Sequence, residues 1–171
     1  VDSVGGIITT VAGTGSAGYW GDAVLATDAK LNNPIGVFAD AGSNIYIADT
    51  DNRRIRKVHA VKGIISTIAG NGAATYAGDG GPAVDASLRN PAGLWVDVTG
   101  NIYIADRDNK RIRKVDATNG LITTVAGNGD GNYLGDGLPA TANGLNKPPG
   151  VFLDGTGNIY IADTDNNSIR K

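Results

Sequence analysis

A tyrosine followed three residues later by the aspartate of a Gly-Asp pair occurs three times in the chain, and this Tyr-x-x-Asp pattern is the first candidate for chemistry. An aromatic ring beside a carboxylate can bind a sugar, a peptide or a cation, and loops on a rigid scaffold often carry such sites. A tryptophan follows the first tyrosine and has no tryptophan at the matching positions of the other two copies. The candidate ligand-binding residues are therefore Tyr19, Trp20, Asp22, Tyr76, Asp79, Tyr133 and Asp136.

A structural role competes with this interpretation. Each tyrosine would fill the space between neighbouring sheets, and each aspartate would hold the glycine-rich turn that contains it. The pair recurs in every copy, which favours the structural role. The unmatched Trp20 is therefore the better candidate for binding.

A second acidic pattern, Asp-x-Asp-Asn, begins at Asp49, Asp106 and Asp163. It is similar to the opening of a calcium-binding loop, which also needs a glycine at its sixth position and a glutamate at its twelfth. The chain has no glutamate, and Arg54 stands where the glycine would be. Aspartate and asparagine side chains also bond their own backbone in turns, so we interpret the pattern as a turn and predict no metal site.

Basic residues gather in and beside one strand of each repeat, and they account for ten of the 15 lysines and arginines. A phosphate-binding stripe is one interpretation. Pairing with the many aspartates on neighbouring turns is favoured, because the net charge is −2 and aromatic residues do not interleave with the cations. Nucleic-acid binding is not predicted. The residues concerned are Arg53, Arg54, Arg56, Lys57, Lys110, Arg111, Arg113, Lys114, Arg170 and Lys171.

Several side chains that enzymes use are missing. The chain has no cysteine, no glutamate and a single histidine, His59. It therefore has no thiol chemistry, no multi-histidine metal centre and no glutamate to act as a general acid or base. We expect no catalytic residue, no metal and no cofactor, and we interpret His59 as an exposed turn residue. No apolar stretch approaches the roughly 18 residues of a membrane span, so no membrane partner is predicted.

These residues are positioned by an internal sequence repeat, because the chain length factors as 171 = 3 × 57. The segment NIYIAD begins at Asn44, Asn101 and Asn158, so each copy starts exactly one period after the previous one. No insertion or deletion interrupts the pattern. The repeat units are 1–57, 58–114 and 115–171, and a fixed period of this kind is the signature of a repeat architecture.

Each repeat is predicted to contain four short strands, at 36–40, 44–49, 54–58 and 64–69 in the first complete copy. Their β-branched residues suit strands, and both faces of 44–49 are apolar, which indicates a sheet covered on both sides. Trp95 aligns with Phe38 and Phe152 on the first strand and is expected in the core. Four antiparallel strands per repeat are typical of a β-propeller blade. We predict an all-β fold with three four-stranded blades; a β-solenoid is the alternative, but its repeats are usually shorter.

The repeat also predicts how chains assemble. Residues 7–12 match a fourth strand that precedes the first complete blade, and the last blade stops after its third strand. An unpaired strand edge and apolar blade faces favour association. We expect two chains joined head to tail as a homodimer, in which each N-terminal strand completes the last blade of the other chain in a six-bladed ring. The expected assembly interface contains Ile7, Ile8, Val11, Ile169, Arg170 and Lys171.

The motifs TVAG-x-G, Gly-Asp, L-N-x-P-x-G-V and NIYIAD-x-x-N-x-x-IRK together resemble the NHL repeat, in three copies that cover the whole chain. The similarity of the copies to one another resembles bacterial NHL arrays. The third copy departs locally, with Asn167-Ser168 where the others have two basic residues. The resemblance implies a six-bladed propeller. Members of the family include receptor-kinase sensor domains, protein- or RNA-binding modules and a few lyases with a metal at the propeller centre.

The predicted function is that of a non-catalytic scaffold for protein interaction or ligand binding, which assembles from three-blade chains. Its expected partners are a second copy of itself and a protein, peptide or sugar ligand. The alternative is a lyase or hydrolase acting at the central opening of the ring. The resemblance speaks against that alternative, since the lyases of the family hold their metal partly with histidines and this chain has one histidine. RNA binding by analogy with some family members is a third hypothesis and would predict a steep dependence on salt.

Overall fold

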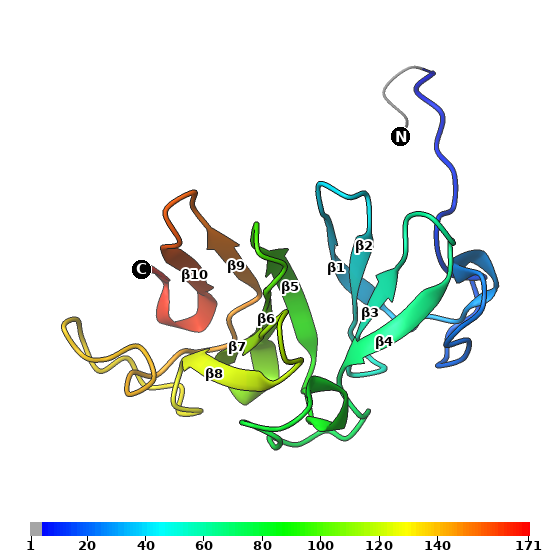
Figure 1. Cartoon of the computed structure of the whole chain (residues 1–171). Helices are drawn as coiled ribbons and strands as arrows, with labels where there is room; N and C mark the ends of the chain where they lie inside the picture. The colour runs from blue at the N-terminus through cyan, green and yellow to red at the C-terminus, as the bar shows by residue number, and fades with distance from the viewer. Residues whose placement is uncertain (1–4) are drawn as a thin grey trace.

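The computed structural model describes residues 5–171, which form three antiparallel β-sheets set side by side (Figure 1). Two sheets have four strands and the third has three, and in each sheet strands that are consecutive in the chain lie side by side. The first sheet contains β1 (Pro34–Ala39), β2 (Ile45–Asp49), β3 (Arg54–Val58) and β4 (Ile65–Ala69). The second contains β5 (Pro91–Val96), β6 (Ile102–Asp106), β7 (Arg111–Val115) and β8 (Ile122–Ala126). The third contains β9 (Gly150–Leu153), β10 (Ile159–Asp163) and β11 (Ser168–Arg170).

Neighbouring sheets pack face to face through the apolar side chains that the strand pattern predicts. Tyr46 and Ala48 of β2 share a buried cluster with Leu94 and Ile104 of the second sheet. A corresponding cluster joins the second sheet to the third. Both faces of β6 are buried, because this strand lies in the middle sheet. This arrangement is that of consecutive blades of a propeller-type fold.

The first strands of the three sheets, β1, β5 and β9, approach one another closely. A Cβ on Gly36 would overlap the carbonyl oxygen of Ala92, and one on Gly93 would lie 2.7 Å from the carbonyl oxygen of Pro149. Glycine at these two positions therefore permits the close approach of neighbouring strands. A Cβ on Gly150 would meet nothing within 4 Å among the described residues, because no further sheet follows β9 there.

The long connections carry one turn of 3-10 helix before each of the first two sheets, η1 (Ala26–Asp28) and η2 (Ala83–Asp85). Two more turns, η3 (Arg107–Asn109) and η4 (Thr164–Asn166), lie between the second and third strands of the later sheets. The turns η3 and η4 agree with the turn expected at the Asp-x-Asp-Asn pattern. No helix in residues 5–171 is long and apolar enough to cross a membrane.

The strand bounds differ slightly from the expected ones. The first strand begins at Pro34 rather than residue 36, because residue 34 already pairs with Asp49 ahead of a β-bulge. The second and fourth strands begin one residue later than expected, and the third matches. Residues 7–12, expected as a strand, form no ladder in the single chain because no strand lies beside them. The first four residues of the unit 1–57 lie outside the described residues.

Candidate functional site

A buried arginine of the third strand joins two aspartates in each complete sheet. Arg56 is fully buried, with Nη2 2.9 Å from Asp22 and Nη1 3.3 Å from Asp49. Arg113 forms the same pair of contacts with Asp79 and Asp106. Arg56 and Arg113 thus pair with aspartates as the sequence predicted, whereas Arg54 and Arg111 donate to backbone carbonyl groups.

The tyrosine of the Tyr-x-x-Asp pattern closes each of these ion pairs from the solvent side. The Tyr19 hydroxyl donates to Asp22 over 2.9 Å, and its ring centroid lies 3.7 Å from the guanidinium carbon of Arg54. Tyr76 donates to Asp79 over 2.7 Å and packs against Arg111 in the same manner. We call each set of one tyrosine, two aspartates and the arginine that joins the aspartates a Tyr–Asp–Arg cluster. The clusters are Tyr19, Asp22, Asp49 and Arg56; Tyr76, Asp79, Asp106 and Arg113; and Tyr133, Asp136, Asp163 and Arg170. These mutual bonds favour a structural role over ligand binding, but a different one from that expected: the tyrosines are partly exposed and the aspartates bind arginine.

The third Tyr–Asp–Arg cluster, in the last sheet, is looser than the other two. Arg170 lies 3.6 Å from Asp136 and 3.4 Å from Asp163. The side chain of Asp136 is 86% exposed, against 40% for Asp22 and 32% for Asp79. This cluster therefore faces solvent where the others are covered.

The aspartates that open the Asp-x-Asp-Asn pattern are fully buried, which the sequence does not reveal. Asp106 accepts a 2.7 Å bond from the Arg89 backbone N–H and a 2.8 Å bond from Asn109. Burial raises the pKa of Asp106 to about 6, although these hydrogen bonds and Arg113 oppose the rise. The pattern is a turn as predicted, and its first residue is also the buried counter-ion of the arginine.

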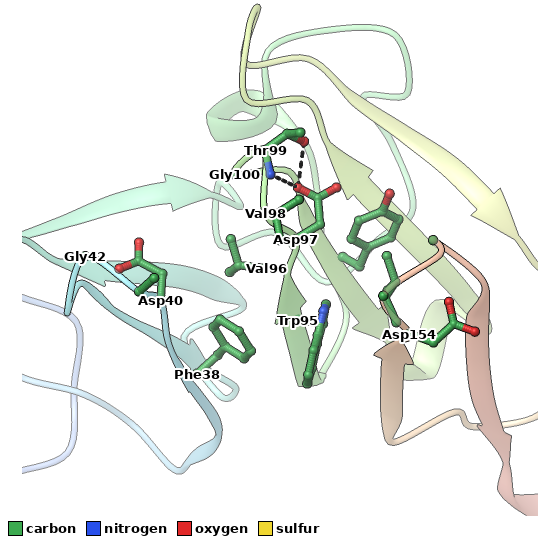
Figure 2. Close-up of a pocket in the computed structure, with 15 residues that line it drawn as sticks. Phe38, Asp40, Gly42, Trp95, Val96, Asp97, Val98, Thr99, Gly100 and Asp154 are labelled. Carbon is green, nitrogen blue, oxygen red and sulfur yellow. Dashed lines mark hydrogen bonds between the residues drawn. The ribbon is translucent and has the colours of Figure 1, made fainter.

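A cavity of about 590 Å³ lies elsewhere, at the first strand of each sheet and the turns that follow β1, β5 and β9 (Figure 2). Phe38, Trp95 and Leu153 supply its apolar wall, one residue from each sheet. The Trp95 ring makes edge-to-face contacts with Phe38 and with Phe152, at centroid distances of 4.9 and 4.6 Å. Trp95 therefore packs against its neighbours as expected, but it also lines a cavity, which the sequence interpretation missed.

Three carboxylates, Asp40, Asp97 and Asp154, stand at this cavity, one on each turn (Figure 2). Asp97 accepts hydrogen bonds from Thr99 and Asn101 over 2.7–2.9 Å. Partial burial raises the pKa of Asp97, but these bonds outweigh it and hold the pKa below the usual value. Hydrogen bonds from Asn158 and Thr156 lower the pKa of Asp154 in the same way. The three groups are ionised acceptors fixed within their turns.

Known proteins with similar sequences identify the family of this chain. The family model described as the Teneurin NHL domain matches residues 72–133. Human NHL repeat-containing protein 2 is 29% identical over 138 residues, covering 77% of this chain and 19% of that protein. Mouse Teneurin-4 is 34% identical over 134 residues, covering 71% of this chain and 5% of that protein.

The chain belongs to the NHL-repeat family. It spans less than a fifth of the length of these two relatives. A solved structure of a protein of unknown function from Bacteroides thetaiotaomicron is 27% identical, with a TM-score of 0.65 over 74% of this chain and 31% of that one. The arrangement of sheets in this NHL chain therefore also occurs within that larger protein.

The remaining predicted positions of this NHL chain lie apart from the cavity. Trp20 is 55% exposed and pairs through its backbone with Lys30. His59 is half-buried and lies 3.1 Å from the Ser66 hydroxyl, so the expectation of an exposed turn residue was wrong. The reason is that the turn after β3 folds His59 against β4. Within residues 5–171, no three histidine, cysteine, aspartate or glutamate side chains gather so that they could hold a metal ion.

The signal for the cavity was present in the sequence. Phe38, Trp95 and Phe152 are aromatic residues at one position of three successive repeats. A position on the innermost strand of a blade faces the ring axis as well as the neighbouring blades. Repetition of an aromatic residue there indicates that the three rings meet, and two of them, Phe38 and Trp95, line the cavity.

Proposed function

We propose that this NHL chain is a non-catalytic binding module that holds a protein or peptide ligand in the aromatic cavity of its inner strands, and that two chains assemble into a six-bladed ring. The observation that carries the proposal is the cavity of about 590 Å³ whose wall is built from Phe38, Trp95 and Leu153. Largely apolar cavities with a few fixed polar groups are typical of ligand-binding sites.

The carboxylates at the cavity support binding rather than catalysis. A general base works best when its pKa lies near the operating pH, whereas the pKa values of Asp40, Asp97 and Asp154 are lowered. Asp106, whose pKa is raised to about 6, is fully buried and does not line the cavity. Three fixed negative charges beside an aromatic wall favour a ligand that presents an apolar side chain next to a lysine or arginine.

The unpaired parts of the chain support assembly. The outer edge of β11 has no partner strand among the described residues. Residues 7–12 have the sequence of a fourth strand but no sheet, and Ile8 is 82% exposed where the equivalent Ile65 and Ile122 are 0% exposed. One chain therefore offers both a vacant edge and a strand that fits it. Two chains joined in this way would contain six blades, three from the repeats of each chain.

The binding site is tested by selecting short peptides from a phage-displayed library on the immobilised wild-type chain. We expect the selected peptides to share aromatic or aliphatic residues beside lysine or arginine. They should bind the Trp95→Ala variant at least about tenfold more weakly, since truncating a central aromatic residue commonly costs more than about 1.4 kcal/mol. The matched control is Trp20→Ala, which removes an exposed tryptophan that does not line the cavity and should leave binding unchanged. Binding that depends on Trp20 and not on Trp95 would place the site elsewhere.

The assembly is tested by native mass measurement of the purified chain. A mass of twice the 17.4 kDa of one chain is expected. A stable monomer on dilution would overturn the assembly, and a larger closed ring would overturn the number of blades. Elemental analysis of the same sample tests the non-catalytic assignment, because a stoichiometric transition metal would favour an enzyme.

A further inference from the structure

The third Tyr–Asp–Arg cluster lacks a member that the fourth strand supplies to the other two. In the first sheet, the Thr67 hydroxyl of β4 lies 3.3 Å from the Tyr19 hydroxyl and donates to Asp22 over 3.2 Å. In the second sheet, the Thr124 hydroxyl of β8 lies 3.2 Å from the Tyr76 hydroxyl, and the Thr124 backbone N–H donates to Asp79 over 3.1 Å.

In the last sheet, the Tyr133 hydroxyl bonds only to Asp136, over 3.3 Å, within the described part of the chain. No fourth strand lies beside β11 in residues 5–171, so no threonine reaches this cluster. The exposure of Asp136 follows from the same vacancy. The third cluster has its tyrosine, aspartates and arginine but lacks the threonine that a fourth strand supplies to the other two.

The repeat identifies the missing threonine. Thr10 stands one repeat period before Thr67, as Thr67 stands one period before Thr124. Thr67 pairs with Arg56 and Thr124 pairs with Arg113 in the sheet registers. The same register pairs Thr10 with Arg170, the arginine of the third cluster.

The surface beside β11 has room and chemistry for this strand. A cavity of about 430 Å³ there is lined by Ile161, Ile169, Asp136 and Arg170, among others. In the complete sheets, the equivalent space holds the buried side chains of β4 and β8, including Ile65 and Ile122. Ile8, at the matching position of the N-terminal segment, is an apolar side chain that is exposed in the single chain.

Residues 7–12 of the same chain do not reach the edge of β11. The N-terminal segment and the third sheet lie at opposite ends of the molecule (Figure 1). The two complete sheets stand between them. Residues 7–12 of a second copy carry the sequence that fits this edge.

We propose that Thr10 of a second copy completes the Tyr133–Asp136–Arg170 cluster when residues 7–12 of that copy add as the fourth strand beside β11. This inference rests on the proposed assembly and names the polar contact that fixes its register. The hydroxyl of Thr10 would lie between Tyr133 and Asp136, and the added strand would cover Asp136 as β4 and β8 cover Asp22 and Asp79. A one-residue slip would place Thr9 or Val11 there and turn Ile8 to the opposite face.

A double-mutant cycle on the dimer tests the contact. Thr10→Val removes the hydroxyl and keeps a β-branched side chain, and Tyr133→Phe removes its partner. The dissociation constant of each homodimer is measured by sedimentation, in enough urea to bring it into the micromolar range. A hydrogen bond worth about 1 kcal/mol weakens the dimer about fivefold per site, hence about 25-fold over the two sites of a symmetric dimer.

The double variant Thr10→Val/Tyr133→Phe should then be about as weak as either single variant, because both changes break the same bond. Thr10→Ser, which keeps the hydroxyl, should dimerise nearly as well as the wild type. The control Thr9→Val changes the neighbouring residue on the other face of the strand and should show no coupling to Tyr133→Phe.

Two results overturn the inference, and they are distinguishable. A dimer in which the effects of Thr10→Val and Tyr133→Phe simply multiply would retain the assembly and exclude this contact. A wild-type chain that stays monomeric would exclude the assembly and the contact together.

Discussion

The second and third sheets contain nearly the same residues, yet the polar cluster is more exposed to solvent in the third sheet than in the second. Arg113 is fully buried between Asp79 and Asp106, whereas the side chain of Arg170 remains 14% exposed between Asp136 and Asp163. The difference follows from the fourth strand, since β8 covers Arg113 and no fourth strand among residues 5–171 lies beside Arg170. The same ion pairs therefore form in both sheets, and the fourth strand determines how far they are shielded from solvent.

A buried arginine is stable in a blade only when carboxylates and an aromatic ring surround its guanidinium group. Removing a guanidinium from water is costly, and the cost is offset only when its partners are well placed. In the second sheet two carboxylates and the ring of Tyr76 surround Arg113. In the third sheet one of the two carboxylates, Asp136, is 86% exposed to solvent.

The largest expected effect separates these two arginines. Arg113→Met leaves the carboxylate of Asp106 buried without its cation, which should lower the free energy of unfolding by about 3–5 kcal/mol. Arg170→Met also leaves the buried Asp163 without its cation, but Arg170 is 14% exposed and its other partner Asp136 is 86% exposed, so the loss should be smaller, about 2 kcal/mol. Urea denaturation of dilute protein measures both. Equal losses for the two variants would contradict the comparison, and a larger loss for Arg170→Met at high protein concentration would indicate that a fourth strand docks there.

The glycines of β5 and β9 differ in the space around them. A Cβ at residue 93 would collide with the backbone of Pro149 and Gly150, so Gly93→Ala should destabilise the chain by about 2 kcal/mol. Gly150→Ala should have almost no effect on the single chain, since a Cβ there meets nothing within 4 Å among the described residues. In a closed ring the repeat would place Ile35 of a second copy against Gly150, and the same substitution would then weaken the dimer. Thermal unfolding and sedimentation of both variants give the two readings.

The buried aspartate of the second sheet predicts a dependence on pH. The pKa of Asp106 is about 6 in the folded chain against a usual 3.8. Its protonation therefore favours the folded state, with a contribution that is complete below about pH 4 and is lost as the pH rises through about 6. Relative to Asp106→Asn, the wild type should gain about 1 kcal/mol of unfolding free energy between about pH 7 and about pH 5. A difference between the two proteins that does not change over this range would contradict the raised pKa.

The smallest expected effect lies in the tyrosines. Tyr76→Phe removes a hydroxyl that bonds Asp79 and lies beside Thr124, and should cost about 1 kcal/mol. Tyr133→Phe removes one longer bond to an exposed carboxylate and should cost less than about 0.5 kcal/mol in dilute protein. Parallel urea titrations of the two variants measure the difference. If they are equally destabilised, the fourth strand contributes nothing to the cluster.

Much of the fold was predictable because it is local. The β-branched NIYIAD runs and the turns after them determine the strands, and the structure agrees to within one or two residues. The pairing of Arg56 and Arg113 with aspartates was also predictable from the number of acidic turns. In each case the evidence lay within one repeat.

The candidate site was less predictable because it depends on contacts between repeats. The sequence interpretation placed binding at the Tyr-x-x-Asp pattern, where the structure shows hydroxyls and carboxylates bonded to one another. It placed Trp95 in a core and did not predict the cavity, since the approach of Phe38, Trp95 and Leu153 requires three sheets to meet. The burial of Asp49 and Asp106 was likewise hidden, because the same Asp-Asn turn would be found on a surface.

The edge-to-face contacts of Trp95 make it an optical gauge of the spacing between blades. Its ring touches Phe38 of the first sheet and Phe152 of the third, so any spreading of the sheets exposes the indole to water. The only other tryptophan in the sequence, Trp20, is exposed and can be replaced by phenylalanine without disturbing these contacts. The emission wavelength of the remaining indole would then report any separation of the three sheets, including one that precedes the unfolding of a strand.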